Sequence, residues 1–212
     1  YLNSKVLNLN RQKGVLSLEP NHGNAKNRNI FMDTYVMKTE LFIDLVYKAR
    51  ELSSMFTLAD MVNEVCGELD VRGVAHRGFF ASITDFKSYY DANMSLIDYK
   101  SAQNLFHEDW PIYTRTNDSC PTHYYDTAEV RNSIISNGCM IEGTIENSII
   151  GRGCVIKKGA VIRNSIVLGG CVIGENVHVE NHVVDKQAKI VRAKEVVAAP
   201  ENPGYVKRSD TL

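Results

Sequence analysis

The fold of this chain is decided by four stretches that align without gaps: VRNSIISNGCMI (130–141), IENSIIGRGCVI (145–156), IRNSIVLGGCVI (162–173) and VENHVVDKQAKI (179–190). Their asparagines stand at positions 132, 147, 164 and 181, so the repeat is 15 and then 17 residues long. Between them, Ile150, Ile156, Ile162 and Leu168 recur every six residues. A period of six suits neither an α-helix nor one long strand, whose side-chain periods are 3.6 and 2. It predicts a parallel β-helix of hexapeptide repeats, with three short strands in each coil.

The cysteines of the repeats occupy equivalent places. Cys139, Cys154 and Cys171 each follow the repeat asparagine by seven residues, and Ala188 takes that place in the fourth repeat. Zinc ligands must converge on one point, whereas stacked coils set these thiols in single file, about 4.8 Å apart. We therefore expect small core residues and no metal site.

The first part of the chain has mixed α/β patterning, and we expect domains over 1–118 and 119–212. Strand-like segments flank a turn at 12–14 and form a predicted hairpin, and further strands are expected over 29–37 and 71–80. Helices are expected to begin near Thr39, Thr57 and Ser82. The segment Ser82-Ile-Thr-Asp85 has the spacing of a capping box, so Ser82 is predicted to cap the third helix.

Composition excludes several classes of partner. The chain has 212 residues, with Lys+Arg 24 against Asp+Glu 25, so charge gives no reason to expect nucleic acid or an anionic membrane. No apolar run approaches the roughly 18 residues of a membrane span, and no leader-like segment opens the chain. Five cysteines without paired spacing favour a reducing, cytoplasmic setting. Because the sequence opens at Tyr1 within a strand-like stretch, we expect a piece of a longer protein.

Two motifs between the halves carry a specific resemblance. D-A-N-M-S-L (91–96) and L-F-H-E-D-W-P-I (105–112), followed by hexapeptide repeats, resemble the glucose-1-phosphate adenylyltransferase (ADP-glucose pyrophosphorylase) family. The resemblance runs from the predicted hairpin to about Ile190 and corresponds to the second half of such a protein. It implies a partial nucleotidyltransferase-like α/β domain followed by a left-handed parallel β-helix.

The family's site residues are replaced in this sequence. The family's second metal-binding aspartate lies in a stretch like G-Y-W-R-D-V-G-T, and the ungapped alignment on GFFASITD (78–85) places Ser82 there. The lysine of the family's E-K-P, which meets the sugar phosphate, becomes Glu19. In the sugar-pocket stretch S-M-G-x-Y, the serine becomes Phe31 and the glycine becomes Asp33. A serine hydroxyl is a weak ligand for Mg²⁺, and a glutamate repels a phosphate.

The resemblance therefore points to the GlgD-type branch of the family, whose members act as non-catalytic regulatory subunits. It implies no catalytic residue and no cofactor in this chain, with Mg²⁺ expected only in a catalytic partner. The implied partner is a catalytic ADP-glucose pyrophosphorylase subunit, in a hetero- or homo-oligomer. A small phosphorylated effector is also implied, and Arg115 and Arg131 lie in the region where relatives bind one.

Two other functions remain open from the sequence. One is a catalytically competent sugar-phosphate nucleotidyltransferase whose metal-binding acid comes from elsewhere. The other is a hexapeptide-repeat acyltransferase, a class that uses a histidine as general base. His178 and His182 lie in the fourth repeat and are the candidates for that base.

Overall fold

The computed structural model describes residues 4–23, 27–52, 57–114 and 117–212. Its contacts divide the chain into two compact units, Tyr1–Arg77 and Gly78–Leu212, called here the N-terminal and C-terminal units. The helices that follow Gly78 are thus grouped with the β-helix. The domain boundary expected at residue 118 stays a prediction. Among the described residues, no helix is long and apolar enough to cross a membrane.

The N-terminal unit is built on the predicted hairpin, which is confirmed. Strands β1 (Lys5–Leu9) and β2 (Val15–Pro20) pair antiparallel. Helix α1 (Thr39–Glu51) packs against α2 (Leu58–Val65), and α2 contacts β2. The amide of Leu18 donates to Oδ1 of Asn63 at 2.7 Å, which ties β2 to α2.

The strands expected over 29–37 and 71–80 are wrong. Each segment touches the hairpin only briefly, through isolated bridges between Val6 and Ile30 and between Gly14 and Arg72. The first segment leaves the extended conformation at Asp33, whose φ of 52° is left-handed. After Gly73 the second segment has no strand beside it in the described structure, so its apolar residues have no ladder to join.

The predicted helix starts fare differently. Thr57 and Asp60 form the expected capping box of α2, whereas the N-cap of α1 is Lys38, one residue before Thr39. The prediction that Ser82 caps the third helix is wrong. Helix α3 (Phe86–Ser95) is capped by Asp85, whose side chain accepts from the amide of Ser88 at 2.7 Å. The Ser88 hydroxyl accepts in return from the Asp85 amide. The capping box of α3 is therefore formed by Asp85 and Ser88, and not by Ser82 and Asp85 as the spacing suggested.

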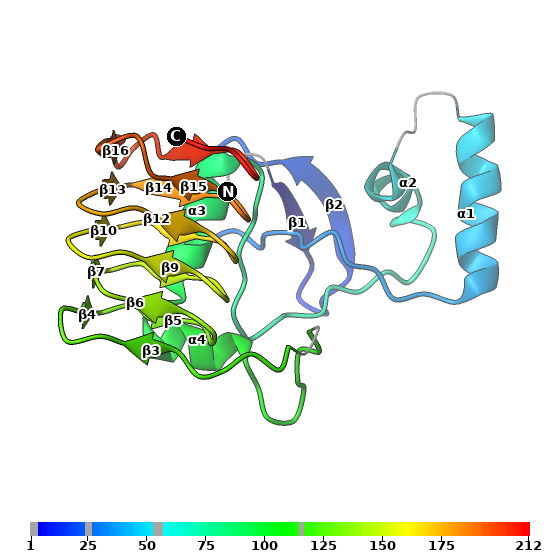
Figure 1. Cartoon of the computed structure of the whole chain (residues 1–212). Coiled ribbons are helices and arrows are strands. Elements are labelled where there is room, and N and C mark those ends of the chain that lie inside the picture. The colour runs from blue at the N-terminus through cyan, green and yellow to red at the C-terminus, as the bar shows by residue number, and fades with distance from the viewer. Residues whose placement is uncertain (1–3, 24–26, 53–56, 115–116) are drawn as a thin grey trace. The chain divides into compact units, whose positions relative to one another are not determined.

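The C-terminal unit contains the predicted parallel β-helix, with hexapeptide coils stacked along one axis (Figure 1). In the described residues its strands form three parallel five-stranded sheets, one for each side of the coil. Equivalent residues stack coil upon coil, as in the series Ile145, Ile162 and Val179.

The first sheet comprises β3 (His123–Tyr124), β6 (Met140–Ile141), β9 (Val155–Ile156), β12 (Val172–Ile173) and β15 (Lys189–Ile190). The second comprises β4 (Glu129–Arg131), β7 (Thr144–Glu146), β10 (Val161–Arg163), β13 (His178–Glu180) and β16 (Glu195–Val197). The third comprises β5 (Ile134–Ile135), β8 (Ile149–Ile150), β11 (Ile166–Val167), β14 (His182–Val184) and β17 (Gly204–Val206).

One corner of the coil is built by the repeat asparagines. Asn132, Asn147, Asn164 and Asn181 have φ between 43° and 54°, the left-handed region that asparagine tolerates better than most residues. Their amides also join successive coils, because Nδ2 of Asn147 donates to Oδ1 of Asn164 at 2.7 Å. The asparagine column thus supplies both the turn and a hydrogen bond between coils.

The residue after each asparagine forms a second column. The hydroxyls of Ser133, Ser148 and Ser165 each donate to the carbonyl two residues back and accept an amide of the next coil. In the fourth coil His182 takes this place, and its Nδ1 lies 2.8 Å from the Glu180 carbonyl. The imidazole lies directly against Gly204 of the next coil, where a Cβ would fall 2.0 Å from Nε2. Only glycine can occupy position 204 beside this ring.

Two helices accompany the β-helix within the C-terminal unit. Tyr90 of α3 is buried against Ile166 and Val183, on the outer face of the third sheet. Its hydroxyl donates to the carbonyl of Asn164 at 2.5 Å. Helix α4 (Tyr99–Leu105) follows, and the Asn104 carbonyl accepts from the amide of Phe79 at 3.3 Å. The segment 79–85 is therefore held at both ends.

The coil cysteines are core residues, as predicted. Cys139, Cys154 and Cys171 are at most 1% exposed, and each thiol donates to a backbone carbonyl at 3.0–3.2 Å. Hydrogen bonding to Cys139 and Cys171, together with burial, raises the pKa of the Cys154 thiol. No cluster of metal-ligating side chains is found within the described part of the chain.

Thiol labelling tests this packing. With a thiol-reactive dye and native protein, exposed Cys120 is expected to react first and half-buried Cys66 more slowly. The three coil cysteines should react only after unfolding in guanidinium chloride, because their sulfurs are out of reach of solvent. A Cys120→Ser variant should lose the fast phase alone. Rapid labelling of more than two thiols in native protein would contradict the stacked core.

The cap of α3 gives a second test. Asp85→Ala should lower the free energy of unfolding by about 1 kcal/mol, because the Ser88 amide loses its acceptor. Asp85→Asn should change it by only a few tenths of a kcal/mol, since asparagine caps almost as well. Urea denaturation measures both. Equal losses would show that the carboxylate acts in some other way.

Candidate functional site

The positions that replace the family's site residues fall in both units. Glu19, Phe31 and Asp33 belong to the N-terminal unit, and Ser82 belongs to the C-terminal unit. Within the N-terminal unit, Val6 pairs with Glu19 on one side and with Ile30 on the other. Two strand spacings, about 10 Å, therefore separate Glu19 from the segment that carries Phe31 and Asp33.

Glu19 stands exposed at the end of β2. Its Oε1 accepts from the Ser17 hydroxyl at 2.8 Å, and that hydroxyl accepts from Nδ2 of Asn8 at 2.8 Å. In the residues that the structure describes, no lysine or arginine forms an ion pair with Glu19. The position carries a negative charge supported by neutral partners, which disfavours a phosphate there.

Phe31 and Asp33 are both engaged with Tyr35. The Phe31 ring packs into the cluster around Val15 and Leu18, and it meets the Tyr35 ring edge to face with centroids 5.3 Å apart. The Tyr35 hydroxyl donates to Oδ1 of Asp33 at 2.7 Å. Burial, and then the hydrogen bond to Asp33, raise the pKa of the Tyr35 hydroxyl. A ring and an acid therefore occupy the segment where the family pattern has serine and glycine.

The backbone of Asp33 supports the alignment on the family's glycine. Its φ of 52° is a conformation that glycine adopts freely and other residues rarely adopt. The residue types alone give no sign of this left-handed turn.

Ser82 lies half-buried in the bend between Gly78 and α3. It stands three residues ahead of the Asp85 cap, and Tyr90 anchors the helix that follows. Phe86, the first residue of α3, also stacks edge to face on Tyr205 of β17 with centroids 5.8 Å apart. The bend is thus supported by the β-helix, but it presents a neutral hydroxyl where the family pattern has a carboxylate.

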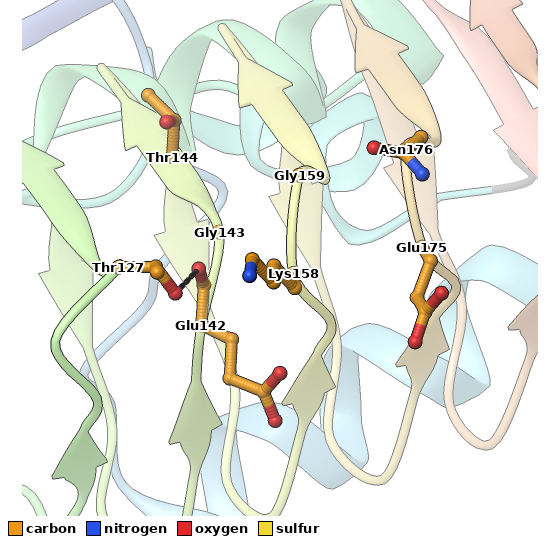
Figure 2. Close-up of a pocket in the computed structure, with 8 residues that line it drawn as sticks. All are labelled: Thr127, Glu142, Gly143, Thr144, Lys158, Gly159, Glu175 and Asn176. Carbon is orange, nitrogen blue, oxygen red and sulfur yellow. Dashed lines mark hydrogen bonds between the residues drawn. The ribbon is translucent and has the colours of Figure 1, made fainter.

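Figure 2 shows a groove of about 420 Å³ on one corner of the β-helix. Its charged side chains are Glu142, Lys158 and Glu175, and the Thr127 hydroxyl donates to the Glu142 carbonyl at 2.7 Å. Gly159 and Asn176, at φ of 73° and 56°, form turns in its wall. The charged lining of the groove is mixed, with two acids and one base.

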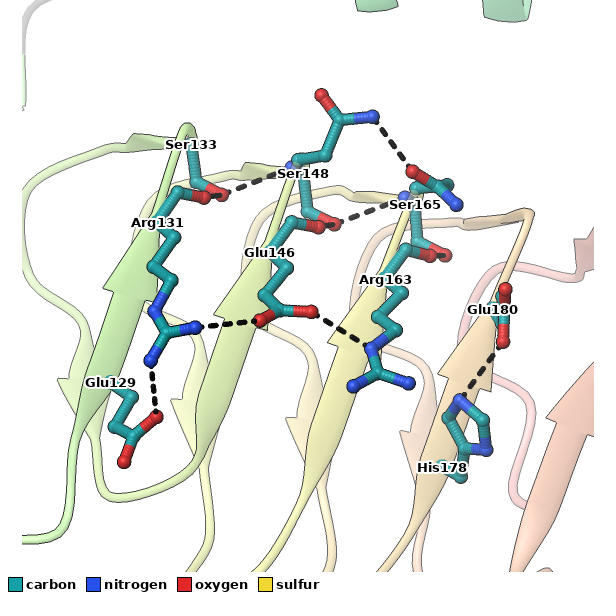
Figure 3. A network of polar contacts seen from close by, with 11 residues as sticks. Glu129, Arg131, Ser133, Glu146, Ser148, Arg163, Ser165, His178 and Glu180 are labelled. Atoms are coloured by element: carbon teal, nitrogen blue, oxygen red, sulfur yellow. Dashed lines mark hydrogen bonds and ion pairs between the residues drawn. The ribbon is translucent and has the colours of Figure 1, made fainter.

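Arg131, one of the two arginines in the region where relatives bind an effector, already has acidic neighbours. It lies 3.4 Å from Glu129 and 3.6 Å from Glu146, within a row of ion pairs on the second sheet (Figure 3). Two carboxylates therefore neighbour its guanidinium, although the side chain stays 70% exposed. Arg115 lies outside the described residues.

The two histidines of the acyltransferase alternative have contacts within the β-helix. His182 is 8% exposed and occupies the serine column with Nδ1 against the Glu180 carbonyl. His178 lies on the second sheet, where its Nε2 is 3.2 Å from Oε2 of Glu180. Neither lines the groove of Figure 2. Both have structural contacts that explain their presence.

Comparison with known proteins finds one family model and several similar proteins. Residues 121–203 match the family described as GlmU-like, C-terminal hexapeptide. Over 84% of its length the chain is 35% identical to the glycogen biosynthesis protein GlgD of Bacillus subtilis, and it covers 51% of that protein. For GlgD of Geobacillus stearothermophilus the identity is 32%, over 74% of this chain and 44% of the relative. For the glucose-1-phosphate adenylyltransferase of Streptomyces coelicolor it is 27%, over 62% of this chain and 37% of the relative. The chain spans about half the length, or less, of the curated relatives it matches.

Position 33 provides a test of the local structure. Asp33→Gly should change the free energy of unfolding by less than about 1 kcal/mol, because glycine accepts the left-handed φ and only the bond to Tyr35 is lost. Asp33→Val should lower it by at least about 1–2 kcal/mol, because a β-branched residue is strained at this φ. Urea denaturation compares the two variants. Similar losses in both would mean that the Asp33 carboxylate, and not the backbone, determines stability here.

Proposed function

We propose, from the likeness of this chain to the GlgD and glucose-1-phosphate adenylyltransferase proteins, that it serves glycogen biosynthesis as a non-catalytic, regulatory component of that enzyme. The reaction concerned joins ATP and glucose 1-phosphate to give ADP-glucose and pyrophosphate. The single observation that carries the proposal is Ser82, which occupies the bend where the family pattern has a metal-binding aspartate.

The chemistry of nucleotidyl transfer explains why this substitution matters. Such reactions depend on metal ions that neutralise the charge of the phosphates, and carboxylates hold those ions. The Ser82 hydroxyl brings no negative charge and is a weak ligand for Mg²⁺. We therefore expect Mg²⁺ to act only in a catalytic partner and not on this chain.

The sugar-phosphate positions support the same proposal. Glu19 places a negative charge where a lysine would meet the phosphate, and a charge reversal at about 4 Å in a partly screened site costs several kcal/mol of binding. The ring of Phe31 and the carboxylate of Asp33 occupy the segment that would line the sugar pocket. Three changes of this kind disfavour the alternative of a competent transferase.

The partners follow from the proposed role. We propose that the chain assembles with a catalytic glucose-1-phosphate adenylyltransferase subunit in the cytoplasm and alters that subunit's response to a small phosphorylated effector. The two carboxylates beside Arg131 favour effector binding elsewhere than on this arginine.

A reconstitution experiment tests the proposal. Pyrophosphate release from ATP and glucose 1-phosphate is measured with this chain alone, with a catalytic glucose-1-phosphate adenylyltransferase, and with the mixture. The chain alone should show no turnover, whereas the mixture should need a different effector concentration for half-maximal activity. Turnover by the chain alone, or a mixture that behaves as the catalytic subunit by itself, would contradict the proposal.

A matched variant separates binding from regulation. The quadruple change Glu19→Lys, Phe31→Ser, Asp33→Gly and Ser82→Asp restores the family pattern at all four positions, and calorimetry should detect glucose 1-phosphate binding that increases with Mg²⁺. The unmodified chain should show no Mg²⁺-dependent binding. The variant should regulate the catalytic subunit as the unmodified chain does, because regulation does not use these positions.

A further inference from the structure

The outer face of the second sheet carries charges that alternate in sign from coil to coil. Arg131, Glu146, Arg163 and Glu180 occupy the same outward position in β4, β7, β10 and β13, and they are called here the charge ladder. Figure 3 shows them in line along the β-helix axis. Glu146 lies 3.6 Å from Arg131 and 2.9 Å from Arg163.

These lateral ion pairs leave the cations largely open to solvent. The side chains of Arg131 and Arg163 are 70% and 47% exposed. Exposed pairs of this kind contribute little to folding, at most about 1 kcal/mol each. The ladder keeps much of its charge available for a second surface.

A second column runs beside the ladder on the same face. Glu129, Thr144, Val161 and His178 stand two residues before the ladder residues of the same strands. This column also has an acid in the first coil and a basic side chain in the fourth, with small uncharged residues between them. This column therefore has an acid where the ladder begins with a base, and an imidazole where the ladder has an acid.

The alternation of charge favours one kind of partner. The four charges are plus, minus, plus, minus from the first coil to the fourth. When a second copy lies antiparallel, its order is reversed, so each charge of one ladder faces an opposite charge of the other and the two faces attract. In a parallel arrangement with ladder against ladder each charge would face its own like, and a parallel arrangement with the ladder against the neighbouring column would leave Glu146 and Arg163 without an opposite charge. We propose that the charge ladder pairs with the ladder of a second copy of this chain in antiparallel orientation.

The register follows from the same charges. The two copies are related by a two-fold axis that runs along the strands, between the coils of Glu146 and Arg163. This axis sets Arg131 of one copy against Glu180 of the other, and Glu146 against Arg163. The neighbouring column then sets Glu129 against His178, and Thr144 against Val161. Moving the axis onto the coil of Glu146 would set Arg131 against Arg163, which repels. A closed two-fold contact uses one surface patch on both copies, as this one does.

The size of the face limits the strength of the contact. Four coils at about 4.8 Å and strands of three residues give a few hundred Å² on each copy, well below the roughly 800 Å² of a stable interface. The contact is therefore weak and sensitive to salt, and its charges set orientation more than affinity. The inference does not depend on the proposed function, because association can be measured without any other protein.

The first experiment reverses one end of the ladder. Glu180→Arg leaves the lateral pairs of Glu146 with Arg131 and Arg163 in place, but it would set arginine against Arg131 of the second copy twice in each dimer. Sedimentation equilibrium at low salt should show concentration-dependent dimers of the unmodified chain and association at least about tenfold weaker in the variant. Raised salt should weaken the unmodified dimer. No dimer of the unmodified chain at low salt, association only with a different protein, or an unchanged variant would each overturn the proposal.

A compensating change separates this contact from a purely internal role. Adding Arg131→Glu to Glu180→Arg places like charges beside each other within the chain, at Glu146 and at Arg163, so the melting temperature should fall. The same change restores opposite charges across the proposed contact, so dimer formation should recover. Recovery of association with loss of stability is expected, and association that falls further would overturn the proposal.

Cross-linking tests the register. In a Cys66→Ser, Cys120→Ser background, one preparation carries Thr144→Cys and another carries Val161→Cys. Mild oxidation should form a disulfide between the two preparations when they are mixed, and much less within either preparation alone, because equal positions of the two copies are offset by one coil and a disulfide needs Cβ atoms within about 4.5 Å. Equal cross-linking in all three samples would overturn the antiparallel register.

Discussion

Every coil of the β-helix must place its residues directly above those of the coil before it, because the backbone hydrogen bonds run along the stack. A substitution in one coil therefore alters the packing of the residue directly above it in the next coil. The inward column of isoleucine and valine excludes water, the cysteine column fills a narrow place, and the asparagine column turns the chain. Each coil alone is too thin to bury its apolar side, so the sequence can vary only in ways that the adjacent coils accept.

The same stack determines where the candidate site stands. Tyr90 attaches α3 to the outer face of the third sheet, and Asp85 fixes the residue at which that helix begins. The bend with Ser82 lies immediately before this cap. Asp85 and Tyr90 follow Ser82 closely in the sequence, and they fix the backbone after its bend. Ser82 brings a neutral hydroxyl to this bend, where the aligned family pattern has a carboxylate.

Much of this could be predicted from the sequence, and the failures have physical causes. Periodicity identifies the β-helix and its cysteines because the same contacts recur at each level. The strands expected over 29–37 and 71–80 were wrong, because apolar content does not show whether a strand has a neighbour to pair with. The Ser82 cap was wrong because two overlapping boxes compete, and only three-dimensional contacts show that the Asp85 box forms. For the site, alignment on a family pattern names four positions, and their assignment stays a prediction. No sequence motif predicts the left-handed φ of Asp33 or the hydrogen bond that it accepts from the Tyr35 hydroxyl.

The imidazole of His182 in the serine column has a consequence for how such a protein can grow. Solenoids lengthen by duplicating a coil, and the second and third coils could be copied, since serine follows serine in their columns. A copy of the fourth coil would set one imidazole upon another, in a place where only a residue without a Cβ fits. The pair of His182 and Gly204 therefore marks the end of the duplicable region. Lineages that extend or shorten this β-helix should do so on its N-terminal side, and positions 182 and 204 should change together.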